Sequence, residues 1–93
     1  MDIMQLGGNI ELAGFNDTSK SQLAVLKKIV GNYAKEFSEK AKVGKLSIIM
    51  SKEGDDYRIT AELAGDKPLK SEASGSNLFF SLGAVLENIK KEL

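Results

Sequence analysis

The chain contains no cysteine and no histidine, and each absence removes a class of chemistry. Without cysteine there are no disulfide bonds and no thiolate metal sites. Without histidine the chain lacks the usual proton shuttle at neutral pH and the commonest ligand of transition metals. An enzyme built from this sequence would therefore need a mechanism based on carboxylates, lysine, serine or tyrosine.

Long apolar runs and an excess of charge of one sign are also missing. No run approaches the roughly 20 apolar residues of a membrane span, and the N-terminus has no signal-peptide pattern. The 13 basic and 13 acidic residues cancel, whereas dedicated nucleic-acid binders are strongly basic. We therefore expect a single cytoplasmic domain over residues 1–93, no membrane partner, and nucleic-acid binding only through a local patch.

Alternation of apolar and polar residues predicts four strands. The first runs from Ile3 to Phe15, with a bulge or sharp twist at Gly7 and Gly8. The second and third begin at Lys45 and Tyr57 and form a hairpin around an acidic turn. The fourth begins at Leu69 and precedes a glycine loop.

Two stretches have the 3.6-residue periodicity of amphipathic helices. The first spans about Ser19 to Ala41, and the second begins at Asn77 or Leu78 after good capping residues. Small residues also recur every seven positions in the first helix, at Ala24, Gly31 and Ser38. Because glycine inside a helix costs about 1 kcal/mol relative to alanine, we expect the second helix to approach closely there.

The predicted order of elements is therefore β-α-β-β-β-α, an α+β two-layer sandwich. A strand-helix-strand crossover makes the first two strands parallel, and the others follow as an antiparallel meander in the order 1-2-3-4. Both helices then cover one face of the sheet. The opposite face is expected to be polar and open to water, and its predicted members are Ser47, Ser51, Arg58, Thr60, Glu62, Lys70, Glu72 and Ser74.

The stretch LKSEASGSNLFFSLGAVLENIKKEL resembles the last strand and helix of the ribosome hibernation promoting factor family, also called ribosome-associated inhibitors or ribosomal subunit interface proteins. GGNIEL, at residues 7–12, is similar to that family's first strand. The matching positions near the C-terminus are Ala73, Gly75, Asn77, Leu78, Phe79, Leu82, Leu86, Ile89 and Leu93. The resemblance spans nearly the whole chain.

This resemblance implies binding to the rRNA of the small ribosomal subunit at the decoding region, through basic residues of the two helices, with modulation or silencing of translation. The positions that it suggests for RNA contact are Lys27, Lys28, Lys35, Lys90 and Lys91. It implies neither catalysis nor a cofactor. The alternative for the lysines of the first helix is a solvated face with ion pairs between residues four positions apart.

A different class of function also fits the residues. Phe80 lies roughly opposite the apolar stripe of its helix, and Gly83 and Ala84 beside it leave a flat surface. In this interpretation the chain is a protein-interaction module of the same fold, without RNA binding, that binds a second copy of itself or another protein. Balanced charge favours it. The alternative for Phe80 is partial burial under a neighbouring loop.

We expect no catalytic activity, no small-molecule substrate and no metal. Glu53, Asp55 and Asp56 surround a turn glycine without the ligand positions of a calcium loop, so we interpret them as a solvated hairpin turn. The charged residues of the polar face, Arg58 and Lys70 among them, are interpreted as ordinary cross-strand pairs.

Overall fold

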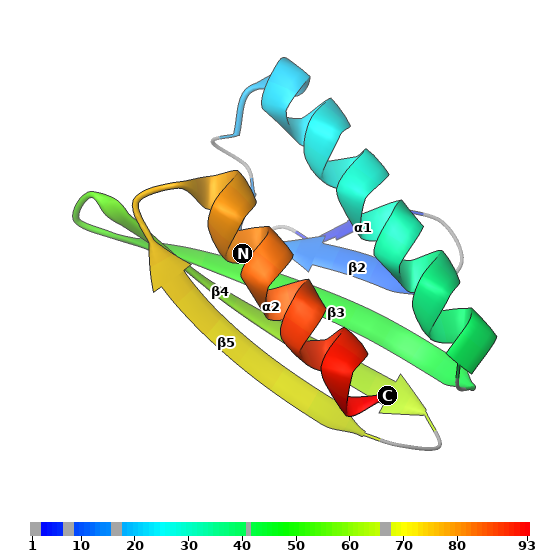
Figure 1. The fold of residues 1–93 in the computed structure, drawn as a ribbon. Coiled ribbons are helices and arrows are strands. Elements are labelled where there is room, and N and C mark those ends of the chain that lie inside the picture. Colours follow the sequence, from blue (N-terminus) through cyan, green and yellow to red (C-terminus); the bar gives the residue numbers. More distant parts are fainter. Residues whose placement is uncertain (1–2, 7–8, 16–17, 41, 66–67) are drawn as a thin grey trace.

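The chain folds into two layers, a sheet and a pair of helices that lie together on one face of it (Figure 1). This computed structural model describes residues 3–6, 9–15, 18–40, 42–65 and 68–93. Its elements in order are β1 (Ile3–Gln5), β2 (Ile10–Ala13), α1 (Lys20–Lys40), β3 (Val43–Glu53), β4 (Asp56–Gly65), β5 (Leu69–Gly75) and α2 (Leu78–Glu92). Strands of the sheet follow one another in chain order, from β1 to β5.

The prediction of four strands was wrong, because the described residues form a five-stranded sheet. The expected first strand is two antiparallel strands, with Met4 of β1 opposite Leu12 of β2. In this register even-numbered residues face even-numbered residues, so both strands keep the alternation of a single longer strand. The amide of Leu6 donates to the carbonyl of Ile10 at 3.0 Å as the chain reverses. The expected bulge at Gly7 and Gly8 lies outside the described residues.

The rest of the topology agrees with the prediction. β2 and β3 are parallel, as a strand-helix-strand crossover requires, and β3, β4 and β5 form an antiparallel meander. The hairpin turn at Glu53 and Asp56 is confirmed, and so is the placement of both helices on one face (Figure 1). The fold class is therefore α+β, with one strand more than the sequence indicated.

The core fills the space between the helices and the sheet. Helix α1 contributes Leu26, Val30 and Phe37, which are fully buried at the spacing of one helical face. The same core cluster contains the following side chains of α2 and of the strands: Leu12, Leu46, Ile48, Met50, Ile59, Ala61, Leu63, Leu78, Leu82, Val85, Leu86 and Ile89. Among the described helices, none is long and apolar enough to cross a membrane.

Local signals fix where the elements begin. Asn77 caps α2, and its side-chain oxygen accepts a hydrogen bond from the amide of Phe80 at 3.0 Å. The Ser19 hydroxyl accepts from the amide of Gln22 at 3.3 Å at the start of α1. Gly14, where the chain leaves β2, has a φ of 83°, and a Cβ there would overlap the carbonyl oxygen of Met50. Only glycine fits this crossing.

Candidate nucleic-acid interface

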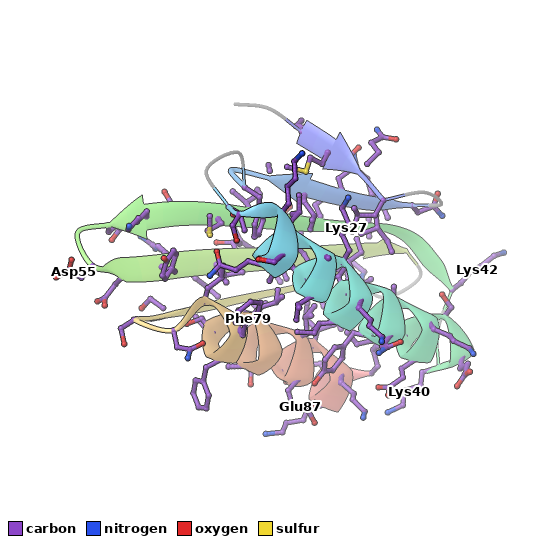
Figure 2. The ribbon with its side chains drawn as sticks, turned by 90° about the horizontal axis from the view of Figure 1, so that it is seen from above. Lys27, Lys40, Lys42, Asp55, Phe79 and Glu87 are labelled. Atoms are coloured by element: carbon purple, nitrogen blue, oxygen red, sulfur yellow. The ribbon has the colours of Figure 1, made fainter. Side chains whose placement is uncertain are left out.

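One side of α1 carries a row of exposed lysines, which we call the lysine flank: Lys20, Lys27, Lys28 and Lys35. They recur at spacings of seven and eight residues, so they share one helix face over a length of about 22 Å. Figure 2 shows Lys27 on the side of α1 away from α2. Three of the four, Lys27, Lys28 and Lys35, were predicted from the sequence. Lys20 was missed, although its seven-residue spacing to Lys27 was visible in the sequence.

The lysine flank is not neutralised by neighbouring carboxylates. Among the residues that the structure describes, no acidic group forms an ion pair with any of its four lysines. The pairing predicted four residues apart along α1 is absent in this part of the chain: Glu36 faces α2 and pairs with Lys90, and the exposed Glu39 forms no ion pair with Lys35. Five lysines against two glutamates give α1 a formal charge of +3. The local basic patch that the sequence required is therefore present.

The lysines of α2 do not join this flank. The Nζ atom of Lys90 lies 3.1 Å from an Oε atom of Glu36, which places Lys90 in the contact between the helices. The hydrogen bond from Lys90 to Glu36, with the negative charge of Glu36, raises the pKa of Lys90. Lys91 is exposed elsewhere on α2. The structure thus brings Lys27, Lys28 and Lys35 together and leaves Lys90 and Lys91 apart from them.

A second polar contact holds the two helices in place. The hydroxyl of Tyr33 donates a hydrogen bond of 2.9 Å to a carboxylate oxygen of Glu87. Partial burial, followed by this bond to Glu87, raises the pKa of Tyr33 above 10. Together with the pair of Glu36 and Lys90, the bond occupies the side of α1 that faces α2. The lysine flank on the other side stays in solvent.

Two more lysines lie at the C-terminal end of α1, where Lys40 is the last residue of the helix and Lys42 follows it. Figure 2 shows Lys40 and Lys42 at that end of the molecule, while Asp55 lies at the far end of the β3–β4 hairpin. Both lysines are exposed and, within the described residues, neither forms an ion pair. They were not among the predicted contact residues. They add positive charge at the C-terminal end of the helix.

On the open face of the sheet, which points away from the helices, basic side chains pair with acidic side chains of neighbouring strands. Arg58 donates from Nε to Glu72 across β4 and β5 at 2.9 Å, and Lys70 lies 3.5 Å from Glu62. The ion pair of Lys45 and Glu11 spans β2 and β3 at 3.0 Å. The interpretation of this lattice as cross-strand pairing is therefore confirmed.

Phe80 projects from the first turn of α2, with 78% of its surface exposed. The alternative of partial burial under a loop is therefore wrong. Gly83 and Ala84 are half-buried, and a Cβ added at Gly83 would meet no heavy atom of the described residues outside its own helix within 4 Å. The surface around Phe80 is open, as a partner-binding surface must be. Binding of a protein partner by this surface stays a prediction.

The acidic residues do not converge. Glu53, Asp55 and Asp56 are exposed at the β3–β4 turn, as expected of a solvated hairpin. Among the described residues, no group of three or more His, Cys, Asp or Glu side chains is placed to hold a metal ion. A hollow of about 550 Å³ lies on the open face beside Lys45, Glu62 and Lys70, whose charges are already paired.

The comparison with solved structures supports the fold. The chain is similar to a ribosomal subunit interface protein from Coxiella burnetii, with a TM-score of 0.59 and 8% sequence identity. The alignment covers 91% of this chain and 90% of the other. No protein-family model and no curated protein sequence matches the chain. The likeness therefore lies in the fold.

Proposed function

We propose that this protein is a non-enzymatic, cytoplasmic ribosome-associated factor that binds rRNA of the small subunit near the decoding region and modulates or silences translation by occupying it. The fold shared with a ribosomal subunit interface protein supports the ribosome as partner. The lysine flank supports RNA as the surface that is bound. We assign the main phosphate contacts to Lys27, Lys28 and Lys35.

One observation carries the proposal: the positive charges of the lysine flank have no partner within the described chain, whereas those of the open face do. Phosphate contacts supply most of the affinity of such complexes, because each one releases condensed counterions. A lysine already held by a carboxylate must first lose that pair. The unpaired flank of α1 can therefore bind a phosphate backbone at lower cost than the open face.

The test is co-sedimentation of the purified protein with small ribosomal subunits at low salt. We expect the parent protein to migrate with the subunits and to be released as salt rises. The variant Lys27→Gln/Lys28→Gln/Lys35→Gln should bind at least about 30-fold more weakly, since each lost phosphate contact removes part of the electrostatic attraction. All three positions are exposed, so folding should be unaffected.

The matched control removes the same kind of charge from the open face. Lys45→Gln/Lys70→Gln should bind subunits as the parent does, since both lysines already pair with carboxylates. Absence of the parent protein from the subunit fractions at low salt would refute the proposal. Equal losses in the two variants would refute the assignment of binding to α1.

A second candidate function rests on the exposure of Phe80. An aromatic ring that is 78% exposed beside Gly83 and Ala84 suits the anchor of a protein-interaction surface. In that case Phe80→Ala should weaken association with a protein partner by about 1 to 3 kcal/mol and leave the thermal midpoint unchanged. Identical recovery of partners by the parent and the variant would eliminate this candidate.

A further inference from the structure

The outer edge of β5 is the longest free strand edge that the structure describes. β5 pairs with β4 over its whole length, from Leu69 opposite Leu63 to Gly75 opposite Tyr57, without a bulge. Pro68 precedes the strand, so every residue within β5 keeps its backbone N–H. The strand at the other edge, β1, has three residues. A straight free edge of seven residues is a template for another strand.

The side chains of β5 favour one kind of added strand, namely β5 of a second copy. Lys70 and Glu72 flank Ser71 on the open face. A two-fold axis at Ser71 would place Lys70 of each copy directly opposite Glu72 of the other. In such a pair the Cβ atoms lie about 5 Å apart and opposite charges attract. Pairing centred on Glu72 would instead oppose two carboxylates, so the charges select the register.

The same register extends ion pairs that already exist. Glu62 lies 3.5 Å from Lys70, and Arg58 donates to Glu72 at 2.9 Å. Across the junction the charges would alternate from Glu62 to Lys70, then to Glu72 and Arg58 of the second copy. On the helix side Leu69 would lie opposite Ala73. Both side chains are only half-buried in the single chain, and the second copy would cover them.

The helix layer leaves room for this approach. A hollow of about 310 Å³ lies between β5 and the end of α2, with Ser71 and Asn88 in its lining. Helix α2 packs against both β4 and β5. Neighbouring strands lie about 4.8 Å apart, so a helix centred between β4 and β5 would lie about 10 Å from its symmetry mate. This matches the distance of about 8–10 Å between packed helices. The two sheets and the two α2 helices can therefore meet together.

We propose that two copies of this chain join through antiparallel pairing of their β5 strands into one continuous ten-stranded sheet, with Ser71 on the axis and Lys70 facing Glu72. This inference does not depend on the proposed function. β5 lies at the opposite end of the sheet from β1 and β2, and the lysine flank faces away from α2 (Figures 1 and 2). The dimer would leave both lysine flanks exposed for RNA.

The test measures molar mass in solution, with no RNA present, by sedimentation equilibrium from about 10 μM to about 1 mM protein. The parent protein should form a concentration-dependent dimer. Lys70→Glu places two carboxylates opposite each other at both symmetric contacts, and Glu72→Lys does the same with two ammonium groups. We expect each variant alone to raise the dimer dissociation constant by at least about tenfold.

Mixing the two variants provides the decisive result. In the mixed dimer, Glu at position 70 of the first variant would face Lys at position 72 of the second. Glu72 of the first would face Lys70 of the second. An equimolar mixture should therefore form the dimer again. Lys45→Glu, which also reverses a lysine of the open face, should associate as the parent does; circular dichroism checks that all variants fold. A parent that is monomeric throughout the range, a dimer unaffected by either variant, or a mixture that stays monomeric would overturn the proposal.

Discussion

The lysine flank of α1 and the open face of the sheet both display basic residues to solvent, but they differ in what surrounds those residues. On the sheet, cross-strand neighbours bring Glu11, Glu62 and Glu72 within ion-pair distance of Lys45, Lys70 and Arg58. On α1, the carboxylate of Glu36 is turned toward α2 and pairs with Lys90. A chain of zero net charge can therefore keep one positive surface, because Glu36 is turned away from the flank and Glu39, four residues after Lys35, forms no ion pair with its lysines.

The largest effect is expected from detaching the helix that carries the lysine flank. Phe37 is fully buried and anchors the C-terminal half of α1 in the core. Phe37→Ala should lower the free energy of unfolding by about 3 to 5 kcal/mol, the usual cost of removing a buried aromatic ring. Urea denaturation measures it. Val25→Ala, on an exposed part of the same helix, is the control and should change stability by less than about 0.5 kcal/mol.

The contact between the helices provides a smaller effect with a defined pH dependence. Tyr33→Phe removes the hydrogen bond to Glu87 and should cost about 0.5 to 1.5 kcal/mol at pH 7. The pKa of Tyr33 is raised in the folded protein, so this stabilisation is present below the unfolded value near 10 and is lost as pH rises through the folded value. The stability difference between parent and variant should therefore narrow above pH 10.

Tyr57→Phe is the matched control for that experiment, since the Tyr57 hydroxyl donates no hydrogen bond within the described residues. Denaturation at several pH values from 7 to strongly alkaline conditions would separate the two variants. A difference for Tyr33→Phe that stays constant through the alkaline range would show that the bond to Glu87 does not stabilise the helix pair.

The substitution Gly31→Ala tests whether the lysine flank is exposed to solvent, because an exposed flank predicts that the substitution increases the stability of the protein. The close approach of α2 expected at Ala24, Gly31 and Ser38 is wrong, because all three residues are exposed and a Cβ at Gly31 would meet no described atom outside the helix within 4 Å. Gly31→Ala should therefore stabilise the protein by about 0.5 to 1 kcal/mol. A loss in thermal stability would mean that another group contacts this flank.

The smallest effect is expected on the open face. Arg58→Gln leaves Glu72 and Glu53 without their shared cation, so stability at low salt should fall slightly. Because salt screens exposed pairs, the difference should vanish near 1 M salt. Lys28→Gln on the lysine flank should show no such salt-dependent change in unfolding. Equal behaviour of the two variants would remove the distinction between the surfaces.

Helix boundaries and the buried stripes could be predicted from the sequence because they depend on nearby residues. Asn77 is a preferred capping residue, and Leu82 and Ile89 recur at helical spacing, so the start of α2 and its buried face can be recognised from the local sequence. The hairpin of β1 and β2 could not be separated from one long strand, since its register preserves the alternation of the residues around Met4 and Leu12. A strand count from periodicity alone fails in such a case.

The site could be predicted only in part, for a related reason. The spacing of Lys27, Lys28 and Lys35 indicates a shared helix face. The pairing of Lys90 with Glu36 depends on how the two helices dock, and no local pattern encodes that contact. The position of Phe80 opposite the apolar stripe left exposure and partial burial both open, and the structure shows that Phe80 is exposed.

The central claim is that the lysine flank is the surface that binds RNA, and the salt dependence of binding to small ribosomal subunits tests it most directly. For three phosphate contacts, the slope of log affinity against log salt concentration should be steeper by about two to three in the parent than in Lys27→Gln/Lys28→Gln/Lys35→Gln. Lys45→Gln/Lys70→Gln should keep the slope of the parent. A parent and flank variant with the same slope would contradict the account.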